Sequence, residues 1–200
     1  MKVCDIKMKR ECDGRMHQSI VYIIVDRVKE QFITEKVFCQ EYLDISEEEW
    51  ADWKKGAAAI PGDKMQKIKG MFSDYEWMLI QKIARQTILF PEKRHYVVSE
   101  YKRLKSIIAT NWLKTGVAQV ELITQQQRIQ LPINDTRQDN VMLRIVASYG
   151  EWGYDDILEF SMPAMIQQQI AESKVDLLEW VDENLVEAYT EKIERETNNK

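Results

Sequence analysis

The chain has little of three residue types that often mark special architectures. Its 200 residues include only 3 cysteines, 7 glycines and 4 prolines. So few cysteines, in an odd number, fit reduced thiols in a cytoplasm better than a disulfide framework. The scarcity of glycine and proline, together with a hydrophobic fraction of 44%, excludes collagen-like, low-complexity and generally disordered chains. We therefore expect one large globular domain or two small ones.

Long apolar segments and the common catalytic motifs are also missing. No apolar run approaches the roughly 18 residues that suggest a membrane-spanning helix, and residues 1–6 carry charges where a secretory signal has apolar residues. We therefore expect a cytoplasmic protein without a membrane partner. The sequence has no phosphate-binding loop, no dinucleotide-binding glycine motif and no metalloprotease helix. These absences predict that the protein is not an enzyme and has no cofactor.

Two groups of possible metal ligands have unsuitable spacing. Cys4, Cys12 and His17, with Cys39 as a fourth, lack the closely spaced cysteine pair of structural zinc sites. The acidic side chains in residues 151–159 lack the spacing of a calcium-binding loop. We therefore expect Cys39 to be a small buried apolar residue and the acidic segment to be a solvated turn.

Charge is distributed unevenly along the chain, which has a net charge of −5. Residues 61–115 carry 11 basic and 5 acidic side chains, whereas residues 146–200 carry 4 basic and 13 acidic ones. In one interpretation these segments are complementary faces of one molecule or of a homodimer. In the other, the basic segment contacts a polyanion. The charge pattern alone leaves both interpretations open.

Helical periodicity dominates the first part of the chain. Residues 1–16 have no clear period and are expected to form a loose arm. Between residues 17 and 90, apolar residues recur every three or four residues in five segments. This spacing predicts five short helices joined by short polar links. The first helix is expected at about residues 17–32 and the second at 35–43. Residues 91–116 are expected to be a connector, with a basic helix over residues 93–114.

The third of these helices has clear signals at both ends. Ser46 followed by Glu49 forms a capping box, which places the start of the helix after Ser46. Gly56 is a natural residue just beyond its end. Trp50 and Trp53 lie one turn apart, so both fall on one face, which we expect to be buried.

The apolar period changes to two after the connector. The fold class predicted from this change is α+β and mainly α: a five-helix domain over residues 17–90, then a small antiparallel sheet with C-terminal helices over residues 117–200. Ser161 and Pro163 could equally begin a helix, so the end of the last strand stays open. The expected strands are residues 118–122, 129–133, 142–148 and 157–162, and the expected helices are residues 163–172 and 174–195.

Residues 42–56 read YLDISEEEWADWKKG. This segment, within the five helices of about residues 17–90, resembles the phage-repressor and Cro-like helix-turn-helix regulators, the XRE class. In that family the second helix ends in leucine, a turn of the type Gly-Val-Ser follows, and the recognition helix ends in an aromatic residue with glycine three residues later. Leu43, Ser46, Trp53 and Gly56 match this pattern, whereas Asp44 stands where the family usually has glycine.

The resemblance implies that the third helix lies in the major groove of double-stranded DNA and that the protein binds as a homodimer. It also implies that the domain over residues 117–200 serves for dimerisation or sensing. The outward side of this third helix, however, carries three carboxylates and one ammonium group. Affinity for DNA depends largely on neutralising its phosphates. Family positions and helix faces together define the candidate site. The candidate DNA-binding residues are Lys36, Ser46, Glu47, Glu48, Ala51, Asp52, Lys55 and Lys64.

Two functional hypotheses follow from this surface. The first is a transcriptional regulator that binds DNA through these residues. The second is a helix-turn-helix scaffold that no longer reads DNA and instead acts as a protein-interaction module. In the second hypothesis Glu47, Glu48 and Asp52 form an acidic helix face that contacts a basic surface of a protein partner.

Overall fold

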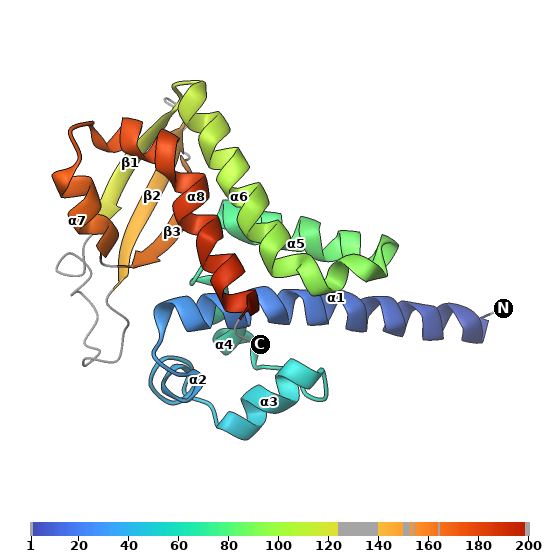
Figure 1. Ribbon diagram of the computed structural model, residues 1–200. Helices are drawn as coiled ribbons and strands as arrows, with labels where there is room; N and C mark the ends of the chain where they lie inside the picture. Colours follow the sequence, from blue (N-terminus) through green and yellow to red (C-terminus); the bar gives the residue numbers. More distant parts are fainter. Residues whose placement is uncertain (1, 124–139, 150–152, 154, 164, 199–200) are drawn as a thin grey trace. The chain divides into compact units, whose positions relative to one another are not determined.

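The computed structural model describes residues 2–123, 140–149, 153, 155–163 and 165–198. These residues form a mainly helical protein with one small antiparallel sheet of three strands (Figure 1). The predicted fold class, α+β and mainly α, is confirmed at this level. The chain forms two compact units: unit 1 consists of Met1–Met71 and Trp77–Tyr101, and unit 2 of Phe72–Glu76 and Lys102–Lys200.

The two units are interleaved along the chain. Helices α5 (Asp74–Leu89) and α6 (Val97–Lys114) each contribute residues to both units. The sequence led us to expect consecutive domains, residues 17–90 and 117–200, with residues 91–116 between them. Periodicity shows that a helix has an apolar face, but it does not show which neighbours cover each part of that face.

Unit 1 begins with the long helix α1 (Lys2–Gln31). The backbone is already helical at Lys2, so the loose arm predicted for residues 1–16 is wrong. The helix is anchored further along by Ile24 and Val28, which have no exposed surface. Extending an anchored helix adds one hydrogen bond per residue without a new nucleation step, even where the sequence has no apolar stripe.

The next segment of unit 1 is only partly α-helical. Thr34 caps α2 (Glu35–Val37) by accepting a hydrogen bond from the Val37 N–H at 3.2 Å. The chain then continues as the π-helix η1 (Phe38–Leu43). The sequence predicted one uniform helix over residues 35–43. Six residues are too few for side-chain spacing to distinguish an α-helical from a π-helical turn.

The remaining helices of unit 1 follow the predictions more closely. They are α3 (Glu47–Lys55) and α4 (Gly62–Lys69), together with the larger part of α5. Between α5 and α6, the segment η2 (Pro91–Tyr96) is a 3₁₀-helix, so α6 begins at Val97, later than the predicted residue 93. Pro91 lacks an N–H group, which favours the short 3₁₀ turn at the break.

Unit 2 contains β1 (Ala118–Ile123), β2 (Asn140–Ser148) and β3 (Asp155–Pro163), in the order β1-β2-β3. Both pairs are antiparallel; Ile145 of β2 lies opposite Val120 of β1 and Leu158 of β3. Three of the predicted strands are therefore confirmed, and Ser161 belongs to β3 and not to a helix. The strand predicted at residues 129–133 lies outside the described residues.

Helices cover one face of this sheet. Leu143, Ile145, Leu158 and Phe160 have no exposed surface and pack in one apolar cluster with residues of α6 and of α8 (Leu177–Asn198). The shorter α7 (Met165–Glu172) precedes α8. Both C-terminal helices begin later than predicted.

The start of α8 has a local cause. The Asp176 carboxylate accepts a hydrogen bond from the Glu179 N–H at 2.9 Å and caps the helix there.

Among the described residues, no helix has the length and apolar character needed to cross a membrane.

Candidate functional site

The candidate residues lie on and beside α3 of unit 1, so the site begins at the turn before that helix. Asp44 has a left-handed backbone (φ 55°, ψ 57°), which aspartate tolerates better than most residues other than glycine. Its carboxylate accepts a hydrogen bond from Lys64 Nζ at 3.0 Å. The Lys64 hydrogen bond and charge hold the pKa of Asp44 below its ordinary value. Lys64 therefore ties the turn to α4.

The predicted capping box at the start of α3 is confirmed. The Ser46 hydroxyl accepts a hydrogen bond from the Glu49 N–H at 3.1 Å, and the Glu49 carboxylate accepts one from the Ser46 N–H at 2.9 Å. Hydrogen bonds from the Ser46 backbone and hydroxyl lower the pKa of Glu49. Glu49 is thus occupied at the helix end, although it lies among the acidic residues of the first turn.

The inner face of α3 is apolar, as predicted. Trp50 and Trp53 are both buried, and their rings stack with centroids 4.8 Å apart. Phe38 of η1 packs edge-on against Trp50 at 5.1 Å. Rings in these arrangements contribute favourable interactions beyond the area that they bury. The aromatic cluster therefore fixes which side of α3 faces outward.

Glu35 of α2 holds the same helix from the side. Its Oε2 atom accepts hydrogen bonds from Trp50 Nε1 at 2.7 Å and from Lys54 Nζ at 2.5 Å. Burial alone would raise the pKa of Glu35, but the Lys54 and Trp50 hydrogen bonds and the Lys54 charge outweigh it and lower the pKa. Lys54 therefore neutralises a carboxylate of its own chain.

His17 of α1 holds the other end of α3. Its Nε2 atom donates to the Trp53 carbonyl oxygen at 2.8 Å, and the two rings meet edge to face at 5.4 Å. Gly56 ends the helix with a left-handed φ of 73°, and a Cβ atom there would lie 3.5 Å from the His17 ring. No local pattern indicates the roles of His17 and Glu35, because their partners lie 36 and 15 residues away along the chain.

The outward face of α3 carries five of the candidate residues. Glu47, Glu48 and Asp52 are exposed, Ala51 is half-buried, and Lys55 is exposed at the end of the helix. Ser46 is exposed as well, and its hydroxyl belongs to the capping box. The structure thus places three carboxylates and one ammonium group on this face.

The neighbouring cations are mostly bound by the chain itself. Besides Lys54, Lys64 is held by Asp44, and Lys67 donates to the backbone carbonyl of Tyr42 at 3.1 Å. Lys36 is exposed on α2. Of the three candidate lysines, Lys36 and Lys55 therefore have no partner within the described part of the chain.

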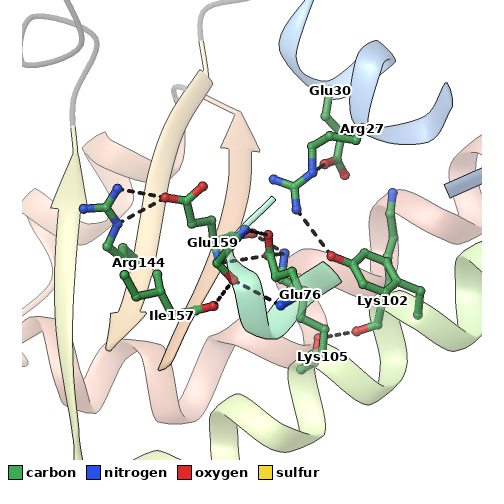
Figure 2. A network of polar contacts seen from close by, with 11 residues as sticks. Arg27, Glu30, Glu76, Lys102, Lys105, Arg144, Ile157 and Glu159 are labelled. Carbon is green, nitrogen blue, oxygen red and sulfur yellow. Dashed lines mark hydrogen bonds and ion pairs between the residues drawn. The ribbon is translucent and has the colours of Figure 1, made fainter. Parts of the chain in front are cut away.

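A second polar cluster lies inside unit 2 (Figure 2). Glu76 Oε1 lies 2.5 Å from Lys105 Nζ, and neither side chain has exposed surface. Glu76 also accepts the Glu159 N–H at 3.0 Å, while Lys105 donates to the Glu159 carbonyl and Ser73 to the Ile157 carbonyl. These backbone groups face away from β2, so the cluster closes the outer edge of β3. Because it is shielded from solvent, we assign it a structural role.

The possible metal ligands do not assemble in the described residues. No group of three or more histidine, cysteine, aspartate or glutamate side chains suitable for a metal occurs among them. Burial raises the pKa of the Cys39 thiol to about 11, and Glu35 and Glu47 add to the rise. In the acidic segment, Asp155 accepts a hydrogen bond from Ser148 at 2.6 Å and Glu159 binds Arg144 at 2.8 Å. The side chains of Cys4 and Cys12 and residue Glu151 lie outside the described part.

This chain was compared with known protein families, proteins and structures. No family model, no curated protein and no solved structure matches this chain.

Proposed function

We propose that unit 1 is a protein-interaction module that presents the outward face of α3 to a basic surface of a partner protein. The observation that carries this proposal is the exposure of Glu47, Glu48 and Asp52 on one side of a helix whose other side is buried. The resemblance to helix-turn-helix regulators supplies the scaffold, and a scaffold of this kind does not by itself specify DNA as the ligand.

The charge balance favours a protein partner over DNA. Duplex DNA carries about one negative charge per 1.7 Å of axis, so a reading helix normally brings cations towards it. Here Lys54 and Lys64 are bound to Glu35 and Asp44 and offer little charge to phosphates. Carboxylates instead form charge-assisted hydrogen bonds with lysine and arginine side chains, which basic protein surfaces supply.

The helix that carries the carboxylates is also held firmly in place. The capping box, the stacked tryptophans and the hydrogen bond from His17 fix both ends and the inner face of α3. A surface that is ordered before binding loses less conformational entropy when a partner docks. This order suits a specific docking surface.

The proposal is tested by photo-crosslinking of the full chain in its native host. A photoreactive amino acid replaces Glu48 on α3, and the matched control carries it at Met165, which is 64% exposed on α7. We expect a protein adduct from position 48 and not from position 165. Adding Glu47→Gln and Asp52→Asn should reduce the adduct at position 48 several-fold, because these changes remove charge without removing side-chain volume.

A parallel measurement compares DNA binding. Fluorescence anisotropy with duplex DNA at low salt should show no binding that weakens with increasing salt. Salt-dependent binding that is lost in Lys55→Ala and kept in Glu47→Gln would overturn the proposal in favour of DNA recognition. A protein adduct of equal yield at positions 48 and 165 would also overturn it.

A further inference from the structure

The outward side of α5 carries a stripe of apolar and basic residues that unit 1 does not use in its core. Met78 and Leu89 are 38% and 75% exposed, and Lys82 and Arg85 between them are exposed as well. Their spacing of four, three and four residues places all four on one face of the helix. We call Met78, Lys82, Arg85 and Leu89 the basic stripe.

The outward side of α8 in unit 2 carries a stripe of the opposite charge. Leu178 and Val186 are 46% and 44% exposed, and Glu179, Asp182 and Glu183 between them are exposed. The core face of the same helix is formed by other residues, among them Val181 and Leu185. The acidic stripe is therefore Leu178, Glu179, Asp182, Glu183 and Val186.

The two stripes are complementary in arrangement as well as in charge. Each has an apolar residue at either end and charged residues between them. At a rise of 1.5 Å per residue, the basic stripe spans about 16 Å and the acidic stripe about 12 Å. Two helices packed side by side could therefore join apolar ends to apolar ends and lysine and arginine to carboxylates.

We propose that the basic stripe on α5 of one copy of the protein binds the acidic stripe on α8 of a second copy. The occupant is a second copy because the same chain supplies both surfaces with opposite charge. The contact uses neither Glu47, Glu48 nor Asp52, so it is independent of the proposed interaction through α3. It gives a structural location to the opposite charges of residues 61–115 and 146–200.

The balance of interactions predicts a weak and salt-sensitive self-association. Exposed ion pairs add little affinity but steer partners and fix their register, while burial of the apolar ends adds a favourable hydrophobic contribution. At physiological ionic strength, charges separated by more than about 8 Å are largely screened. The dissociation constant should therefore rise with salt concentration.

The test uses two reciprocal charge reversals in the full chain, followed by sedimentation equilibrium at low salt. One variant carries Lys82→Glu and Arg85→Glu, and the other carries Asp182→Lys and Glu183→Lys. Each variant alone should have a dissociation constant at least about tenfold higher than the unmodified chain. An equimolar mixture of the two should associate again, because each reversed stripe then meets a stripe of opposite charge.

Matched controls separate this contact from a general effect of charge. Lys36→Glu with Lys55→Glu, and Glu47→Lys with Glu48→Lys, change net charge by the same amounts on a different surface and should leave self-association unchanged. Circular dichroism confirms that each variant is folded. The proposal is overturned if the unmodified chain stays monomeric up to about 1 mM, if the controls weaken association equally, or if the mixture fails to associate.

Discussion

At the scale of single residues, α3 depends on contacts that differ in their distance along the chain. Ser46 and Glu49, three residues apart, could be paired from the sequence, because a capping box is a local pattern. Glu35 and His17 could not, because their partners lie 15 and 36 residues away. The sequence thus predicted which side of α3 faces outward but not which residues hold it there.

The Glu35 carboxylate should make stability depend on pH. Its pKa lies below the ordinary value of 4.5 in the folded protein, so its contribution is present above that pH and is lost as the pH falls through the folded pKa. Glu35→Gln should therefore lower the free energy of unfolding at pH 7, and the difference from the unmodified chain should shrink below about pH 4.5. Urea denaturation at several pH values measures this, with the exposed Glu48→Gln as control. A difference independent of pH would contradict it.

Gly56→Ala should destabilise unit 1 by about 1–2 kcal/mol, because alanine is strained at a φ of 73°. Gly62 is the matched control in the same unit. It has no positive φ, and a Cβ atom there would meet nothing within 4 Å. Gly62→Ala should therefore change stability by no more than about 0.5 kcal/mol or increase it. Equal losses in both variants, measured by urea denaturation, would refute this account of Gly56.

At the scale of elements, β3 shows how a local signal can acquire a long-range role. At the start of α5, the Ser73 hydroxyl accepts a hydrogen bond from the Glu76 N–H at 3.1 Å, which is a local helix cap. The same two residues also bind β3, more than 80 residues further along the chain. Strand alternation predicted β3 itself, whereas nothing local showed that a helix start closes its edge. An unpaired edge invites association with other strands, and here side chains already bind the Ile157 carbonyl and both backbone groups of Glu159.

Lys105→Met should lower the free energy of unfolding by about 3–5 kcal/mol, because it leaves the buried Glu76 carboxylate without its cation. Adding Glu76→Gln removes that uncompensated charge and keeps an oxygen for the Glu159 N–H. The loss in the double variant should therefore be smaller than the sum of the single losses by at least about 1 kcal/mol. A double-mutant cycle in urea measures the difference, and additive losses would show that the two groups are not coupled.

At the scale of the whole molecule, composition and periodicity predicted the fold class but not the interleaving of the two units. Both α5 and α6 are continuous helices with residues in unit 1 and in unit 2. Amphipathic spacing is the same whether a helix packs in one hydrophobic core or in two. The sequence therefore predicted the boundary between domains at the connector, residues 91–116. The interleaving makes the units depend on shared helices.

A destabilising change in unit 2 should therefore also lower the protection of amide hydrogens in unit 1. In Lys105→Met, the amide hydrogens around Ile23 and Ile24 of α1 should exchange faster, as should those of Leu143 and Ile145 in β2. The physical reason is that local unfolding of α5 or α6 removes residues from both units at once. Native-state hydrogen exchange measures this coupling. Unchanged protection in α1 would show that the units open independently.

The buried thiol of Cys39 gives the molecule a built-in reporter. It lies in η1, directly behind the turn that positions α3, and its pKa of about 11 leaves roughly one thiolate in ten thousand at pH 7. An alkylating reagent can therefore modify it at an appreciable rate only in molecules whose η1 segment has opened. The labelling rate of the Cys39 peptide, followed by mass spectrometry, therefore reports how often η1 opens behind the outward face of α3. A partner bound to α3 should lower this labelling rate.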